Sequence, residues 1–137
     1  MVGSIEYQDL IGKPFKDGGR GPIFFDCWGL VKEAFKRAGY NVPEYLISAY
    51  QPELIQAQIF SDQVTWKKLD KPEKNCLVLM RIGKDALVNH CGFYLDNDKI
   101  LHTREKTGVI VQDSTTPTMK AIIIGYLLPP KDFLIND

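Results

Sequence analysis

The stretch Phe25-Asp26-Cys27-Trp28-Gly29-Leu30-Val31 begins the most regular helix pattern in this sequence. The apolar residues that follow have the spacing of a helix with one buried face: Leu30, Val31, Ala34, Phe35 and Ala38. Charged residues occupy the other face, and Gly39 is a typical C-terminal stop. The pattern therefore predicts a helix over residues 27–38. Asp26 is a good N-cap, so Cys27 becomes the first helical residue.

The predicted position of Cys27 favours a reactive sulfur. At a helix start, unpaired backbone N–H groups and the positive end of the helix dipole stabilise a thiolate relative to a thiol. This is one way in which proteins activate a sulfur nucleophile. A lone cysteine is, however, more often a small buried core residue. Position alone leaves both interpretations open, and a base elsewhere in the chain would favour catalysis.

Length and composition indicate one globular domain over residues 1–137. The 17 basic and 17 acidic residues give no net charge, so no nucleic-acid partner is expected. The N-terminus lacks the pattern of a signal peptide, and the longest apolar run, near 121–128, is too short to cross a bilayer. We therefore expect synthesis in the cytoplasm, no membrane insertion, and three reduced cysteines instead of a disulfide framework.

The second half of the chain has the pattern of β-strands. Strands are predicted over residues 76–80, 90–95, 99–103, 109–112 and 121–128. The turn-forming tripeptide Asp96-Asn97-Asp98 joins the second and third of them into a hairpin. Short helices are also predicted over 5–11 and 52–60. Helices followed by strands indicate an α+β fold, with N-terminal helices packed on one face of an antiparallel β-sheet.

The predicted hairpin carries both histidines of the chain, His90 and His102. A three-residue loop at 96–98 pairs Leu95 with Lys99, and this register places His102 opposite Gly92. The two histidines then lie one diagonal step apart on the same face, whereas a two- or four-residue loop would separate them. The missing side chain of Gly92 leaves room beside the imidazole.

Two further patterns have alternative interpretations. The cysteines and histidines could bind zinc, but no spacing matches a pair of zinc ligands, so a metal is not expected. The glycine-rich segment 12–22 is either an ordinary surface loop or a backbone that must pass close to a ligand. We favour the second because this loop leads directly to Cys27.

Two groups of motifs together resemble the NlpC-type cysteine peptidases, a papain-like family that cleaves bacterial cell-wall peptides. The family's first motif is Gly-x-Pro-Tyr, a glycine-rich loop and Asp-Cys-Ser-Gly-Leu-Val; here it resembles Gly12-Lys13-Pro14-Phe15, Gly18-Gly19 and Asp26-Cys27-Trp28-Gly29-Leu30-Val31. The second, His-Val-Gly-Ile-Tyr-Leu-Gly followed by a strand with histidine, resembles His90-Cys91-Gly92-Phe93-Tyr94-Leu95 and Ile100-Leu101-His102-Thr103. The resemblance covers residues 8–128.

This resemblance implies a papain-like fold and a specific reaction. Cys27 would be the nucleophile, His90 the general base and later acid, and His102 the residue that orients His90. The substrate would be a peptidoglycan stem peptide, hydrolysed through a thioester at a γ-D-glutamyl bond to diaminopimelate or lysine. The resemblance implies no cofactor, because this reaction needs neither a metal nor an organic cofactor. Residues of the motifs are expected to contact this substrate: Asp26, Trp28, Gly29, Phe15 and Gly92. Apart from the resemblance, Arg20, Arg81 and Arg104 are candidates for its carboxylate because arginine binds carboxylates bidentately, although a solvated surface charge is the more common role of an arginine.

The chain departs from the family pattern at two positions beside the sulfur. Phe15 stands where the family commonly has tyrosine, and Trp28 where it usually has serine. The tryptophan variant resembles members associated with phage and prophage tails, which implies other phage tail proteins as partners and a location in the virion tail or release to the cell wall. The alternatives are a structural tail component with little activity, or an amidase or acyltransferase on the same fold.

Overall fold

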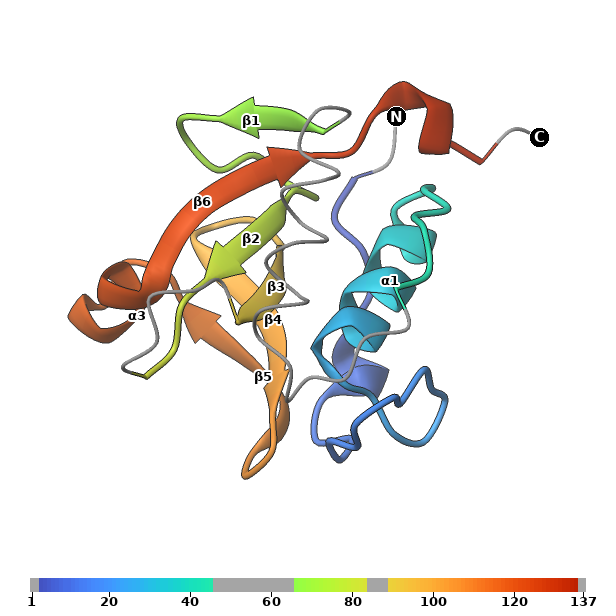
Figure 1. Cartoon of the computed structure of the whole chain (residues 1–137), viewed down its shortest axis with the longest axis vertical. Coiled ribbons are helices and arrows are strands. Elements are labelled where there is room, and N and C mark those ends of the chain that lie inside the picture. Colours follow the sequence, from blue (N-terminus) through green and yellow to red (C-terminus); the bar gives the residue numbers. More distant parts are fainter. Residues whose placement is uncertain (1–2, 46–65, 84–88, 136–137) are drawn as a thin grey trace.

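The computed structural model describes residues 3–45, 66–83 and 89–135. Its centre is one antiparallel sheet in the strand order β1-β6-β2-β3-β4-β5 (Figure 1). The strands are β1 (Lys67–Leu69), β2 (Leu77–Met80), β3 (His90–Tyr94), β4 (Lys99–Arg104), β5 (Gly108–Asp113) and β6 (Ile123–Leu128). The helical elements are η1 (Gln8–Leu10), α1 (Cys27–Arg37), α3 (Pro117–Ile122) and η2 (Lys131–Phe133). The predicted α+β class with an antiparallel sheet is confirmed.

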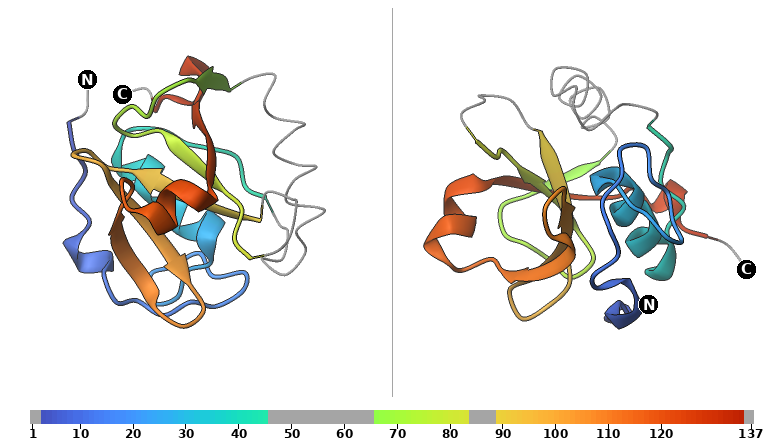
Figure 2. Two further views of the ribbon diagram at one scale, coloured as in Figure 1. Left: turned by 90° about the vertical axis from the view of Figure 1, so that its left-hand side faces the viewer. Right: turned by 90° about the horizontal axis from the view of Figure 1, so that it is seen from below.

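Helix α1 lies along one side of the sheet, and its ends are those expected from its sequence (Figure 2). Asp26 is the N-cap, and its side chain accepts a hydrogen bond from the Gly29 N–H. Ala38 is the C-cap, and Gly39 follows with a φ of 94°, a left-handed conformation that glycine adopts without strain. Cys27 is therefore the first helical residue, as predicted.

The β3–β4 hairpin has the predicted register. Phe93 pairs with Leu101 and Tyr94 with Ile100. The Leu95 N–H donates to the Lys99 carbonyl at 2.9 Å, which closes the three-residue loop. Because side chains alternate along a strand, this odd loop length keeps His90 and His102 on the same face.

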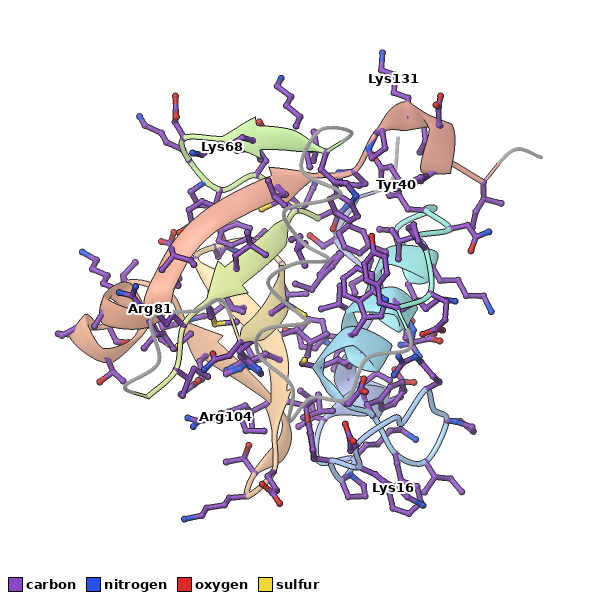
Figure 3. The ribbon with its side chains drawn as sticks, in the orientation of Figure 1. Lys16, Tyr40, Lys68, Arg81, Arg104 and Lys131 are labelled. Atoms are coloured by element: carbon purple, nitrogen blue, oxygen red, sulfur yellow. The ribbon has the colours of Figure 1, made fainter. Side chains whose placement is uncertain are left out.

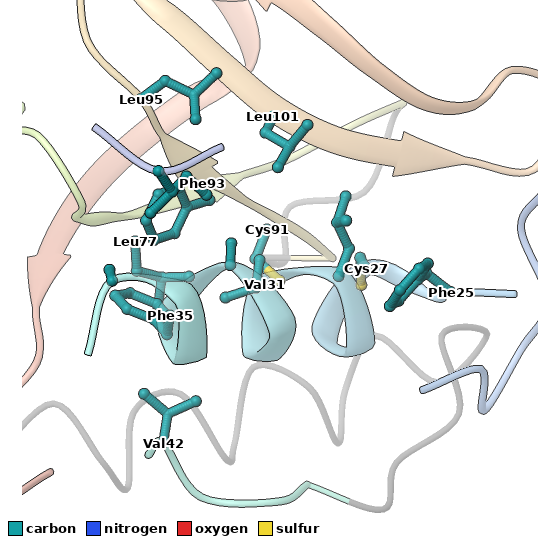
Figure 4. Packing of buried hydrophobic residues seen from close by; sticks show 14 of the residues in the cluster. Phe25, Cys27, Val31, Phe35, Val42, Leu77, Cys91, Phe93, Leu95 and Leu101 are labelled. Atoms are coloured by element: carbon teal, nitrogen blue, oxygen red, sulfur yellow. The ribbon is translucent and has the colours of Figure 1, made fainter. Parts of the chain in front are cut away.

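The main core lies between α1 and the sheet and includes Phe35 of α1 and Phe93 of β3 (Figure 4). The Phe35 ring packs edge-on against Phe93 at 5.0 Å, against Trp66 at 5.8 Å and against Tyr40 at 6.0 Å, measured between ring centroids. Alternate residues of β2, such as Val78, point to the opposite face of the sheet and belong to a second hydrophobic cluster. The helix start is thus held against β3 by packing along the whole length of α1.

The strand predicted over 121–128 is wrong at its first two residues, which belong to α3. Pro117 lies in the first turn of this helix, and the Thr116 hydroxyl caps it by accepting from the Met119 N–H at 3.3 Å. Of the helix predicted over 5–11, only the turn η1 forms. The helix predicted over 52–60 lies outside the described residues. Within the described ranges, no helix is long and apolar enough to cross a membrane.

Candidate functional site

The cysteine at the start of α1 is held in place by the carboxylate before it. Cys27 is 7% exposed and Asp26 is 2% exposed. One Asp26 oxygen accepts from the Gly29 N–H at 2.7 Å and from the Arg20 guanidinium at 2.7 Å. The other oxygen accepts from the Gly18 N–H at 3.0 Å. Asp26 therefore joins the glycine-rich loop to the first turn of the helix, and substrate contact by this residue stays a prediction.

The glycine-rich loop passes directly over the first turn of α1. The Asp26 N–H donates to the Gly19 carbonyl at 3.1 Å. A Cβ atom on Gly29 would lie 2.0 Å from the Gly19 oxygen, and one on Gly19 would lie 2.8 Å from the Lys16 oxygen. These two glycines are thus explained by close contacts within the chain. The expected close approach to a ligand stays a prediction.

The hairpin brings the two histidines into direct contact. His90 Nε2 and His102 Nδ1 are 2.9 Å apart, a hydrogen-bond distance. The ring centroids are 5.1 Å apart at an interplanar angle of 69°. Both side chains are buried, His102 almost completely at 1% exposed. The two histidines that were predicted to share one face are therefore in contact, and their roles as base and orienting residue stay predictions.

The surroundings of Cys27 favour its thiolate. A hydrogen bond with the Cys91 thiol lowers the pKa of Cys27, whereas burial raises it. The hydrogen bond and the positive charge of His90 lower this pKa further, and the negative charge of Asp26 raises it. The resulting pKa of Cys27 is about 5. The same interaction with Cys27, together with burial, raises the pKa of Cys91 well above its usual value. Burial raises the pKa of Cys76 to about 12. Of the three cysteines, Cys27 is the one that is ionised at neutral pH.

His102 is neutral at physiological pH. Burial is the main cause that lowers the pKa of His102 to about 4, and the positive charge of His90 is the second. The hydrogen bond with Gln112 raises this pKa, and the charge of Arg104 lowers it. Gln112 Oε1 lies 2.6 Å from His102 Nε2. The sequence analysis missed Gln112. No sequence pattern pointed to it, because the contact depends on the β4–β5 register of the structure, which places Ile110 opposite His102 and Gln112 one diagonal step away.

The other predicted contact residues pack within the protein. The Trp28 indole N–H donates to the Pro43 carbonyl at 3.0 Å, and its ring lies 4.7 Å from the Tyr45 ring. Phe15 is half-buried and forms an isolated β-bridge with Phe25. For Gly92, an added Cβ would lie 2.9 Å from both Met80 and Ile100, which fill the space left by the missing side chain. Their contact with a substrate stays a prediction.

The three candidate arginines differ in their surroundings. Arg20 is bound by Asp26 at 2.7 Å and by Glu44 at 2.6 Å, and it also donates to the Tyr45 carbonyl. Arg81 and Arg104 are exposed and labelled in Figure 3. Arg81 follows Met80, which pairs with His90, and Arg104 ends β4 two residues after His102. These two arginines are the better candidates for binding a carboxylate near the histidines.

The side chains form a continuous series from Cys27 through His90 and His102 to Gln112. The series contains a thiolate, an imidazole that can exchange a proton with it, and a neutral second imidazole that holds the first. These are the parts needed for nucleophilic catalysis at a carbonyl group.

Comparison with known proteins identifies similar domains. A family model, the NlpC/P60 family, matches residues 12–127. The chain is 29% identical over 100 residues to the probable endopeptidase p60 of Listeria monocytogenes, a match that covers 73% of this chain and 18% of that protein. The chain therefore spans less than a fifth of this curated relative.

Solved structures show the same papain-like fold. A lipoprotein-like NLP/P60 family protein from Staphylococcus aureus aligns with a TM-score of 0.61 at 19% identity, over 93% of this chain and 38% of that one. The P60 domain of an antigen from M. avium subspecies paratuberculosis aligns with a TM-score of 0.55 at 20% identity, over 88% of this chain and 85% of that one.

Proposed function

This chain belongs to the NlpC/P60 family, and on that premise we propose that it is a cysteine peptidase that cleaves bacterial cell-wall peptides. The observation that carries the proposal is the buried Cys27 at the start of α1, next to the hydrogen-bonded pair His90 and His102. The named relative from Listeria is a probable endopeptidase, which is consistent with this chemistry.

Acylation begins at the Cys27 thiolate. The sulfur attacks the carbonyl carbon of the scissile amide, and the backbone N–H of Cys27 at the helix start donates to the oxyanion that forms. The His90 imidazolium transfers a proton to the leaving nitrogen, so the C–N bond breaks and a thioester remains. His102 holds the His90 ring through the 2.9 Å contact during this transfer.

Deacylation uses the same residues. His90, now neutral, accepts a proton from a water molecule that attacks the thioester carbon. The C–S bond then breaks, the carboxylic acid product leaves, and the thiolate–imidazolium pair is restored. The scissile bond that we propose joins the γ-carboxyl of D-glutamate to diaminopimelate or lysine in a peptidoglycan stem. This choice is supported by the family resemblance of both motif groups.

Product analysis tests this function. A stem peptide with L-alanine, γ-linked D-glutamate, diaminopimelate and D-alanine should yield an alanyl-glutamate dipeptide and an amine-terminated fragment by mass spectrometry. Cys27→Ala should reduce the rate by at least about a thousandfold because no nucleophile remains. The matched control peptide carries the α-linked glutamyl isomer and should stay intact. Equal cleavage by Cys27→Ala, or cleavage at another bond, would refute the proposal.

The second candidate is a phage tail component with the same fold and little activity. It is favoured by Trp28, whose indole binds the Pro43 carbonyl and stacks on Tyr45 instead of leaving a small hydroxyl beside the sulfur. In this case the protein would reach the cell wall in the virion tail and would contact other tail proteins. Intact stem peptides, together with slow alkylation of Cys27, would favour this candidate.

A further inference from the structure

We infer that Gln112 is a positioning residue that selects the tautomer of His102. This tautomer in turn determines which ring nitrogen of His90 exchanges a proton with Cys27. The inference rests on the proposed cysteine peptidase, because it concerns the base of that reaction. Its first test, however, requires no substrate.

His102 lies between two partners that use both of its ring nitrogens. Nδ1 is 2.9 Å from His90 Nε2, and Nε2 is 2.6 Å from Gln112 Oε1. A neutral imidazole has one donor nitrogen and one acceptor nitrogen, whereas an amide oxygen only accepts. The proton of His102 therefore lies on Nε2 and is donated to Gln112. His102 Nδ1 is then the acceptor for the Nε2–H of His90.

This tautomer prepares His90 for its role. With Nε2 protonated and bound to His102, the remaining nitrogen of His90, Nδ1, is the one that exchanges a proton with Cys27. When His90 becomes an imidazolium, its Nε2–H already has an acceptor. In the opposite tautomer of His102, two N–H groups would face each other across 2.9 Å, which would disfavour the charged form of His90.

Burial, and not Gln112, keeps His102 uncharged; the hydrogen bond to the neutral Gln112 amide raises the pKa of His102 but adds no negative charge beside it. Among the residues that the structure describes, the charged or titratable groups that act on His102 are His90 on β3 and Arg104 on β4, and both oppose a positive charge on it. A carboxylate at position 112 would instead stabilise the His102 imidazolium, in which both nitrogens donate. His102 could then no longer accept from His90. An amide supplies the acceptor without supplying the charge.

The direct test is the protonation pattern of the two rings in the native protein. Two-bond ¹H–¹⁵N correlation spectra at pH 7 distinguish a protonated from an unprotonated ring nitrogen. We expect His102 to be protonated at Nε2 and unprotonated at Nδ1. Gln112→Leu should produce a mixture of tautomers, and Gln112→Glu should protonate both nitrogens of His102. The Nδ1-protonated tautomer in the wild type would overturn the inference, and this measurement requires no variant to fold.

A second experiment measures how the loss of Gln112 changes the pH dependence of Cys27 alkylation. In Gln112→Leu the midpoint of Cys27 alkylation should rise by about one pH unit, with an alkylation rate about tenfold lower below that midpoint. Gln8→Leu is the matched control, since Gln8 lies on η1 and should leave the profile unchanged. An unchanged profile in a folded Gln112→Leu protein would overturn the inference. If stem peptides stay intact while the His102 tautomer and the pH profile of Cys27 alkylation are as expected, only the proposed peptidase activity is refuted.

Discussion

At the scale of single residues, the surroundings of Cys27 distinguish it from the other two cysteines. Its pKa is lowered to about 5, first by Cys91 and further by His90, whereas burial raises the pKa of Cys76 to about 12. Iodoacetamide at pH 6 should therefore modify Cys27 alone in the native protein. The rate should increase as the pH rises through about 5, because the thiolate is the reactive form, and then level off. Peptide mass spectrometry locates the label.

The variant and the control for this labelling follow from the same contacts. His90→Ala removes a hydrogen bond and a positive charge from the sulfur, so the midpoint should move to higher pH. Protein unfolded in urea is the control, in which all three cysteines should react with midpoints near about 8.5. Labelling of native Cys27 and Cys76 at equal rates at pH 6 would contradict the assignment of the nucleophile.

At the scale of elements, Asp26 determines where α1 begins and how the glycine-rich loop joins it. Asp26→Ala removes the acceptor for the Gly29 and Gly18 N–H groups and a partner of Arg20. The free energy of unfolding should fall by about 2 kcal/mol or more, measured by urea denaturation. Asp26→Asn is the matched comparison: it keeps the capping oxygen for the Gly29 N–H but places an amide NH2 against the Gly18 N–H, so it should cost about 1–2 kcal/mol, less than Asp26→Ala. Equal losses in both variants would exclude capping as the cause.

At the scale of the whole molecule, Phe35 joins the helix layer to the sheet. Its ring is fully buried against Phe93 and Trp66. Phe35→Ala should lower the free energy of unfolding by about 3–5 kcal/mol, because the lost ring leaves a cavity between α1, which carries Cys27, and the sheet, which carries His90. Phe24→Ala, at a ring that is 41% exposed, should change it by about 0.5 kcal/mol at most. Similar urea midpoints for the two variants would contradict this account of the core.

Much of the candidate site follows from local rules. Asp26 caps α1 because a carboxylate one residue before a helix reaches the N–H groups of its first turn. His90 and His102 meet because an odd loop between two strands keeps alternate residues on one face. Such rules act over a few residues, so they could be applied without knowledge of the rest of the fold. They failed at residues 121–122, where Thr116 and Pro117 start the short helix α3.

The sequence by itself therefore determined the fold class, the helix start at Cys27 and the paired histidines. Only the tertiary structure decided which side chains complete the series. Cys91 acts on Cys27 because α1 packs on β3, and Gln112 binds His102 because of the register between β4 and β5. Such contacts join separate elements, and whether two side chains touch depends on how those elements pack, which no local pattern specifies.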